Sequence, residues 1–178
     1  WSERARDPSL VSESIEQLDK TIEGLRGDLA KWSTDTDRVR LARHLVRKCI
    51  CLRLLGRAGE AIGMIDEAID LYRTADRPTA VGLSLIRKVQ SLVAVGDLEA
   101  ALDQARQLEA DGRLLDAHRD LLLQWSGLAH VQRGEVDLAL ADWRECLQIR
   151  EARPNARGSD EIRELIDRLD SSGRNKEF

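Results

Sequence analysis

Apolar side chains recur at alternating steps of four and three residues along most of the chain, and charged side chains occupy the positions between them. The first such segment follows Asp7-Pro8-Ser9, where an acid can cap a helix and a proline can start it. Its apolar positions are Val11, Ile15, Leu18, Ile22, Leu25, Leu29 and Trp32. This spacing predicts one amphipathic helix over residues 8–32.

Short breaks rich in glycine, proline and small polar residues divide the rest of the chain into further helical segments. They predict three pairs of helices, over residues 37–75, 78–111 and 114–151. Ser159 can cap a last helix over residues 159–171, and we expect residues 172–178 to be frayed. The apolar face of that last helix carries Ile162, Leu165, Ile166 and Leu169. Because Leu, Ala, Glu and Arg are abundant and strand-forming aromatic residues are scarce, we expect an all-α fold of about eight helices in one cooperative unit.

The three pairs repeat one pattern around the turn glycines Gly56, Gly96 and Gly134. Large residues lie eleven and four positions before each glycine, as Leu45 and Leu52, Leu85 and Leu92, and Leu123 and His130. Smaller residues lie seven positions before and five after, as Cys49 and Ala61, Val89 and Ala101, and Gly127 and Ala139. Two antiparallel helices that cross closely require small side chains at the crossing, so the pattern predicts helical hairpins.

This pattern resembles the tetratricopeptide repeat, whose hairpin has a large and then a small residue in its first helix and an alanine at the crossing in its second. The resemblance covers roughly residues 9–151. The repeats are degenerate and extended, since their spacings of 40 and 38 residues exceed the ~34 of the family and its closing proline is displaced to Pro78 and Pro154. The resemblance implies a right-handed α-solenoid of antiparallel hairpins, with the 159–171 helix as a C-terminal cap. Repeats of this kind occur in long bacterial regulatory and signalling proteins.

The helix over residues 8–32 aligns with the second helix of a repeat, because Ile15, Leu18 and Ile22 match the spacing of Ile62, Ile65 and Ile69. Its first-helix partner would then lie upstream of Trp1, and the chain would be a fragment of a larger array. The alternative is a native capping helix that needs no such partner.

A second face of the first helices is largely apolar and differs from the face that packs within each hairpin. The resemblance to the tetratricopeptide repeat implies that this face lines the concave groove of the solenoid. Such a groove would bind an amphipathic helix or an extended segment. The alternative is that the extra repeat length, or the 159–171 helix, buries it internally. The Lys and Asn pair with which some members clamp a carboxylate is absent, since Val46 and Ile50 stand there. The twelve candidate groove residues are Arg43, Val46, Ile50, Arg53, Leu83, Ile86, Gln90, Val93, Leu121, Gln124, Leu128 and Val131.

Charge and hydropathy narrow the classes of partner. The net charge is −4 with both signs interspersed, so no basic stripe suits direct binding to nucleic acid. The chain contains no run of ~20 apolar residues of the kind that could span a membrane. Three cysteines without the character of a disulfide framework indicate reduced thiols and a cytoplasmic setting.

Catalytic and metal-binding chemistry has no support in the sequence. Cys49 and Cys51 lie near His44, but residues two apart on a helix point in different directions. His118 and His130 lack an acid or a nucleophile at a telling spacing, and no glycine-rich phosphate loop occurs. We therefore expect neither enzyme activity nor a metal or other cofactor.

The sequence thus predicts a protein–protein interaction scaffold or adaptor, or a sensor segment of a larger bacterial regulatory protein, that binds a helix or peptide in an apolar concave groove. One alternative is a domain that senses a small-molecule effector. Another is a module for self-association or a structural spacer.

Overall fold

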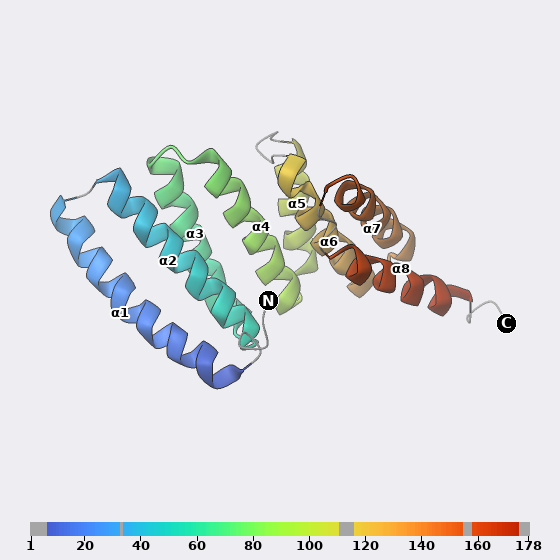
Figure 1. The fold of residues 1–178 in the computed structure, drawn as a ribbon, viewed down its shortest axis with the longest axis horizontal. Helices are drawn as coiled ribbons and strands as arrows, with labels where there is room; N and C mark the ends of the chain where they lie inside the picture. Colours follow the sequence, from blue (N-terminus) through green and yellow to red (C-terminus); the bar gives the residue numbers. More distant parts are fainter. Residues whose placement is uncertain (1–6, 33, 111–115, 155–157, 175–178) are drawn as a thin grey trace. The chain divides into compact units, whose positions relative to one another are not determined.

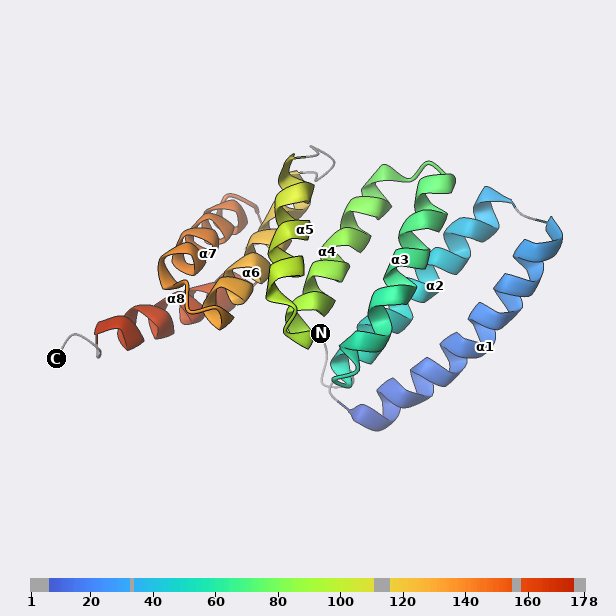
Figure 2. The same ribbon diagram turned by 180° about the vertical axis from the view of Figure 1, so that it is seen from behind.

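The computed structural model describes residues 7–32, 34–110, 116–154 and 158–174, with the side chains of residues 32, 116, 117 and 172–174 excepted. Across these ranges the chain forms eight helices and no strand, which confirms the predicted all-α fold (Figures 1 and 2). The helices are α1 (Pro8–Trp32), α2 (Asp35–Leu54), α3 (Ala58–Thr74), α4 (Pro78–Val95), α5 (Leu98–Ala110), α6 (Asp116–Gln132), α7 (Val136–Glu151) and α8 (Ser159–Arg174).

Two helix ends differ from the sequence prediction by more than one residue. α2 begins at Asp35 because Thr34 is its N-cap, and the Thr34 side chain accepts a hydrogen bond from the Asp37 backbone N–H. α8 continues to Arg174, three residues beyond the predicted end. The predicted helix end at residue 111, the predicted helix start at residue 114, the Trp32 side chain and residues 175–178 of the expected tail lie outside the described residues.

The helices form two compact units, Trp1–Asp97 and Leu98–Phe178, where the sequence suggested a single one. The boundary falls directly after the turn glycine Gly96, so α4 belongs to the first unit and α5 to the second. The predicted hairpin of residues 78–111 therefore spans the boundary. Within each unit, a helix packs mainly on its neighbours in sequence.

In the first unit, α1 packs on α2, α2 on α3, and α3 on α4, while α4 also contacts α2 (Figure 1). The predicted crossing residues Cys49 and Ala61 are 2% and 0% exposed. The Cys49 thiol donates a hydrogen bond to the Ala61 carbonyl oxygen at 3.3 Å, so the two helices approach closely at this point. Buried residues of the four helices surround it, among them Val11, Ile22, Leu41, Leu45, Leu52, Ile65, Ile69, Val81 and Val89.

The three turn glycines are equivalent in structure, as the repeat predicted. Gly56, Gly96 and Gly134 have φ of 74°, 83° and 76°, in the left-handed region that favours glycine. In each turn the glycine N–H donates to the carbonyl three residues earlier, and the next N–H donates to the carbonyl five residues earlier. These two bonds satisfy carbonyl groups at the end of the preceding helix.

The end of α3 forms the same turn with an aspartate. Asp76 has φ of 50°, and its N–H donates to Arg73 O while the Arg77 N–H donates to Tyr72 O. Asp76→Gly should raise the free energy of unfolding by roughly 0.5–1 kcal/mol, because glycine adopts this conformation without steric cost. Urea denaturation measures the change. Gly56→Asp is the reverse substitution at an equivalent turn with open space around it, and it should destabilise; two shifts of the same sign would contradict the equivalence.

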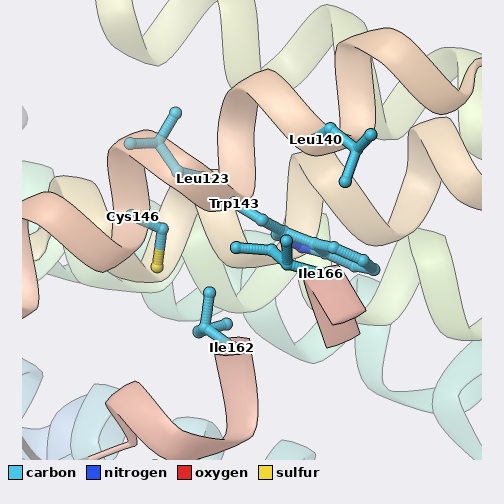
Figure 3. Close-up of a cluster of buried hydrophobic side chains, with 6 residues drawn as sticks. All are labelled: Leu123, Leu140, Trp143, Cys146, Ile162 and Ile166. Carbon is cyan, nitrogen blue, oxygen red and sulfur yellow. The ribbon is translucent and has the colours of Figure 1, made fainter. Parts of the chain in front are cut away.

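In the second unit, α5 packs on α6, α6 on α7, and α7 on α8. A cluster of buried apolar side chains joins α6, α7 and α8, with Trp143 at its centre (Figure 3). The Trp143 indole N–H donates to Gln124 O at 3.1 Å. A Cβ atom on Gly127 would lie 2.4 Å from Trp143 Nε1, so the predicted small-residue position tolerates only glycine without a shift of this ring. The members of the cluster are Leu123, Leu140, Trp143, Cys146, Ile162 and Ile166.

Candidate functional site

The predicted groove residues of the first unit differ in accessibility. Arg43 is exposed, and Val46, Ile50, Arg53 and Leu83 are half-buried. Three residues of α4, Ile86, Gln90 and Val93, are only 1%, 2% and 2% exposed. α4 packs against both α2 and α3, and most of its surface is buried. The expectation of an apolar groove open along α4 is therefore corrected: these three residues are core.

The predicted groove residues of the second unit are half-buried, and most of them already have neighbours within the unit. Leu128 and Val131 pack against the Trp143 cluster, to which α8 contributes Ile162 and Ile166. The Gln124 side chain accepts a hydrogen bond from Arg150. Leu121 is half-buried as well. In this unit the alternative of internal burial, with the last helix contributing to the cover, describes Leu128 and Val131 better than an open groove.

One of the predicted groove residues, Ile50, lines a hollow. It lies in a cleft of about 590 Å³ between α1 and α2. The α1 wall was missed by sequence reasoning, which used α1 only as a packing helix, although its lining residues recur at steps of three, one and three. The lining residues are Ser14, Gln17, Leu18 and Thr21 from α1, and His44, Arg47, Ile50 and Cys51 from α2.

The cleft exists because short side chains face it from α1. The hydroxyl groups of Ser14 and Thr21 donate to carbonyl oxygens of their own helix, Leu10 O and Gln17 O, at 2.8 and 2.9 Å. They therefore stay close to α1 and leave the space between the helices open. The neighbouring apolar face of α1 holds the two helices together through its buried residues Val11, Ile15, Ile22 and Leu25.

His44 supplies an unsatisfied polar atom beside the cleft. Its Nδ1 is buried and has no hydrogen-bond partner among the described residues. Burial lowers the pKa of His44 below its usual value, and the nearby charges of Arg47, Arg40 and Arg43 lower it further. The ring is therefore neutral at neutral pH, and Nδ1 donates or accepts a hydrogen bond according to the tautomer.

The charged side chain in the lining of this cleft is positive. Its lining includes the guanidinium group of Arg47 and no carboxylate. Arg43 lies one helical turn before Arg47 on α2, and neither forms an ion pair with a residue that the structure describes. By contrast, Lys48 on the same helix pairs with Asp19 of α1. Arg47 therefore gives the lining of the cleft a positive charge that no described carboxylate pairs with.

A second cleft, of about 340 Å³, lies between α5, α6 and α7. The Nδ1 atom of His130 lies 2.6 Å from Glu135 Oε2, and Arg133 Nε lies 2.9 Å from the other Glu135 oxygen. The hydrogen bond with His130 is the main cause that lowers the pKa of Glu135. Sequence reasoning treated His130 only as a large packing residue, because its partners come from the following turn and helix.

The described residues show no arrangement suited to metal binding or thiol chemistry. No group of three or more His, Cys, Asp or Glu side chains in them could hold a metal ion. Burial raises the pKa of Cys49 to about 12 and that of Cys146 to about 11, and it also raises the pKa of Cys51. These groups are therefore thiols at neutral pH and poor nucleophiles.

None of the helices that the structure describes combines the length and the apolar character that a bilayer crossing requires. Comparison with protein-family models, curated proteins and solved structures finds no match for this chain. The assignment of a function therefore rests on the fold, the two clefts and the charges around them.

Proposed function

We propose that this chain is a tetratricopeptide-like helical-repeat module that binds an acidic amphipathic segment of a partner protein in the cleft between α1 and α2. The repeat reading is supported by three turns closed by the same hydrogen bonds and by buried small residues at the predicted crossings. In this proposal the helices build a right-handed solenoid of antiparallel hairpins. The module acts without catalysis, as a scaffold, adaptor or sensor segment of a larger bacterial cytoplasmic protein.

The observation that carries the proposal is the combination of apolar and positive groups in one cleft. Leu18 and Ile50 offer apolar contacts from opposite walls, and Arg47 offers five N–H donors. A carboxylate on the partner would pair with Arg47 or Arg43, and an apolar residue one turn away would contact Ile50. A basic segment would be disfavoured, since the lining holds Arg47 and no carboxylate.

A display selection of random peptides against the purified chain tests this function. Selected peptides should be enriched in Asp and Glu together with apolar residues at steps of three or four. Arg47→Glu should weaken the Kd of these peptides by roughly tenfold or more, because it replaces an attractive charge by a repulsive one. Arg73→Glu is the matched control, since Arg73 is exposed on α3 and does not line the cleft.

The control variant should bind within about twofold of the wild type, because rim and distant charges contribute little to affinity. Higher salt should weaken the wild-type complex. Selected peptides without an acidic bias, or equal Kd values for Arg47→Glu and the wild type, would contradict the proposal.

A further inference from the structure

The cleft between α5, α6 and α7 combines apolar walls with a group of charged side chains. Its apolar part is formed by Leu102 and Ala105 of α5, Leu123 of α6 and Leu138 of α7. The Ser126 hydroxyl donates to Leu122 O within its own helix, so it does not bridge the space. The volume of about 340 Å³ is at the lower end of the range of small-ligand pockets, ~300–1,000 Å³.

Asp142 lies in this cleft without a hydrogen-bond donor among the residues that the structure describes. Its side chain is 23% exposed, and the basic atom paired with it, His130 Nε2, is 3.9 Å away, beyond hydrogen-bond distance. No other described residue forms an ion pair with it. His130 is held instead through Nδ1 by Glu135. A half-buried carboxylate of this kind retains its full capacity to accept hydrogen bonds from a ligand.

The charges near the cleft do not balance. Arg106 pairs with Asp103, and Arg133 pairs with Glu135. A single guanidinium, that of Arg119, lies between Glu109 and Glu145, at 3.8 and 2.9 Å. With Asp142 the group therefore holds five carboxylates against three guanidinium groups, and even a protonated His130 would leave it negative. The members are Asp103, Glu109, Glu135, Asp142 and Glu145, with Arg106, Arg119 and Arg133.

We propose that this cleft is a binding site for a small alkylammonium ion, whose nitrogen donates to Asp142 while its alkyl chain lies against Leu102 and Leu138. The ammonium group would supply the donor that Asp142 lacks and reduce the excess of negative charge. The apolar walls select against metal cations, which prefer several oxygen ligands. This site lies within the second unit and is independent of the peptide-binding function proposed for the α1–α2 cleft.

Binding at this site should depend on pH. Burial raises the pKa of Asp142 to about 6, with further raising by Glu109 and Glu145 and an opposing effect of His130. Asp142 is therefore ionised above pH 6 and protonated below it, and only the ionised form attracts the ligand strongly. The other charged groups facing it are Glu109 and Arg106 of α5, His130 and Arg133 of α6, Glu135 of the turn, and Glu145 of α7.

Titration calorimetry of the full chain with n-pentylammonium chloride tests the site, with n-pentanol as the neutral probe. The ammonium ion should bind at about pH 7.5 and about tenfold more weakly at about pH 5, where roughly a tenth of Asp142 is ionised. Asp142→Asn should weaken binding at the higher pH by roughly tenfold or more. Asp137→Asn removes the same charge from the exposed first turn of α7, outside the cleft, and should leave the Kd unchanged within about twofold.

Chemical-shift mapping by NMR locates the ligand independently of these variants. The ammonium ion should shift the amide signals of Ser126, His130 and Asp142 and leave those of α1 and α2 in place. Equal Kd values for Asp142→Asn and Asp137→Asn, equal binding of n-pentanol, or an absence of binding at millimolar ligand would overturn the inference.

Discussion

Asp120→Leu is expected to destabilise the second unit by about 3–5 kcal/mol, because it leaves a buried guanidinium group without its carboxylate. Asp120 and Arg150 have side chains only 7% exposed, and Arg150 Nε donates to Asp120 Oδ2 at 2.9 Å. The same guanidinium group donates to Gln124 Oε1 and Gly158 O, and thus links α6, α7 and the start of α8. Chemical denaturation followed by circular dichroism measures the loss.

Two further variants separate the cost of an unpaired charge from the cost of lost packing. Asp120→Leu combined with Arg150→Met should recover much of the lost stability, because it removes both buried charges and leaves without this carboxylate only the more exposed Arg153, which lies 3.0 Å from Asp120 Oδ1. Glu164→Gln breaks an exposed pair with Arg168 and should cost less than about 1 kcal/mol. A double variant no more stable than Asp120→Leu alone would contradict this account of the buried pair.

Ile86→Asp should prevent stable folding of the first unit, because it places an unpaired carboxylate in a site that is 1% exposed. Ile50→Asp should be tolerated much better, since Ile50 is half-buried and borders the cleft between α1 and α2. Thermal melts by circular dichroism measure both variants. The conservative Ile86→Val should cost only about 0.5–1.5 kcal/mol, which would locate the main effect of the aspartate in its charge.

Similar melting temperatures for Ile86→Asp and Ile50→Asp would contradict the division of the predicted groove residues into a buried set on α4 and an accessible set on α2. An unfolded Ile50→Asp variant would show that the α1–α2 cleft is closed in solution.

The sequence predicts best what is determined by neighbouring residues. The left-handed turns at Gly56, Gly96 and Gly134 follow from a residue type that alone adopts that conformation freely. The small residues at the crossings, such as Ala61 and Gly127, were found because they repeat at fixed distances from these turns. Both signals are local, so they can be recognised in the sequence without knowledge of how the helices pack.

The sequence predicts less well what depends on packing between helices. Ile86 was assigned to an open face because the spacing along α4 does not reveal that α4 contacts two other helices. The cleft beside Ile50 depends on the short side chains of Ser14 and Thr21 on a different helix. The pair of Asp120 and Arg150, thirty residues apart, has no periodic signature at all.

The most direct test of the proposed function places a photo-crosslinking amino acid at Ile50 and, as a control, at Leu54. Both positions lie on α2, but Leu54 is exposed and does not line the cleft. Irradiation with an acidic amphipathic peptide from the display selection should yield a crosslinked product from position 50 and much less from position 54. Equal yields from the two positions, or crosslinking at position 54 alone, would contradict binding in the cleft between α1 and α2.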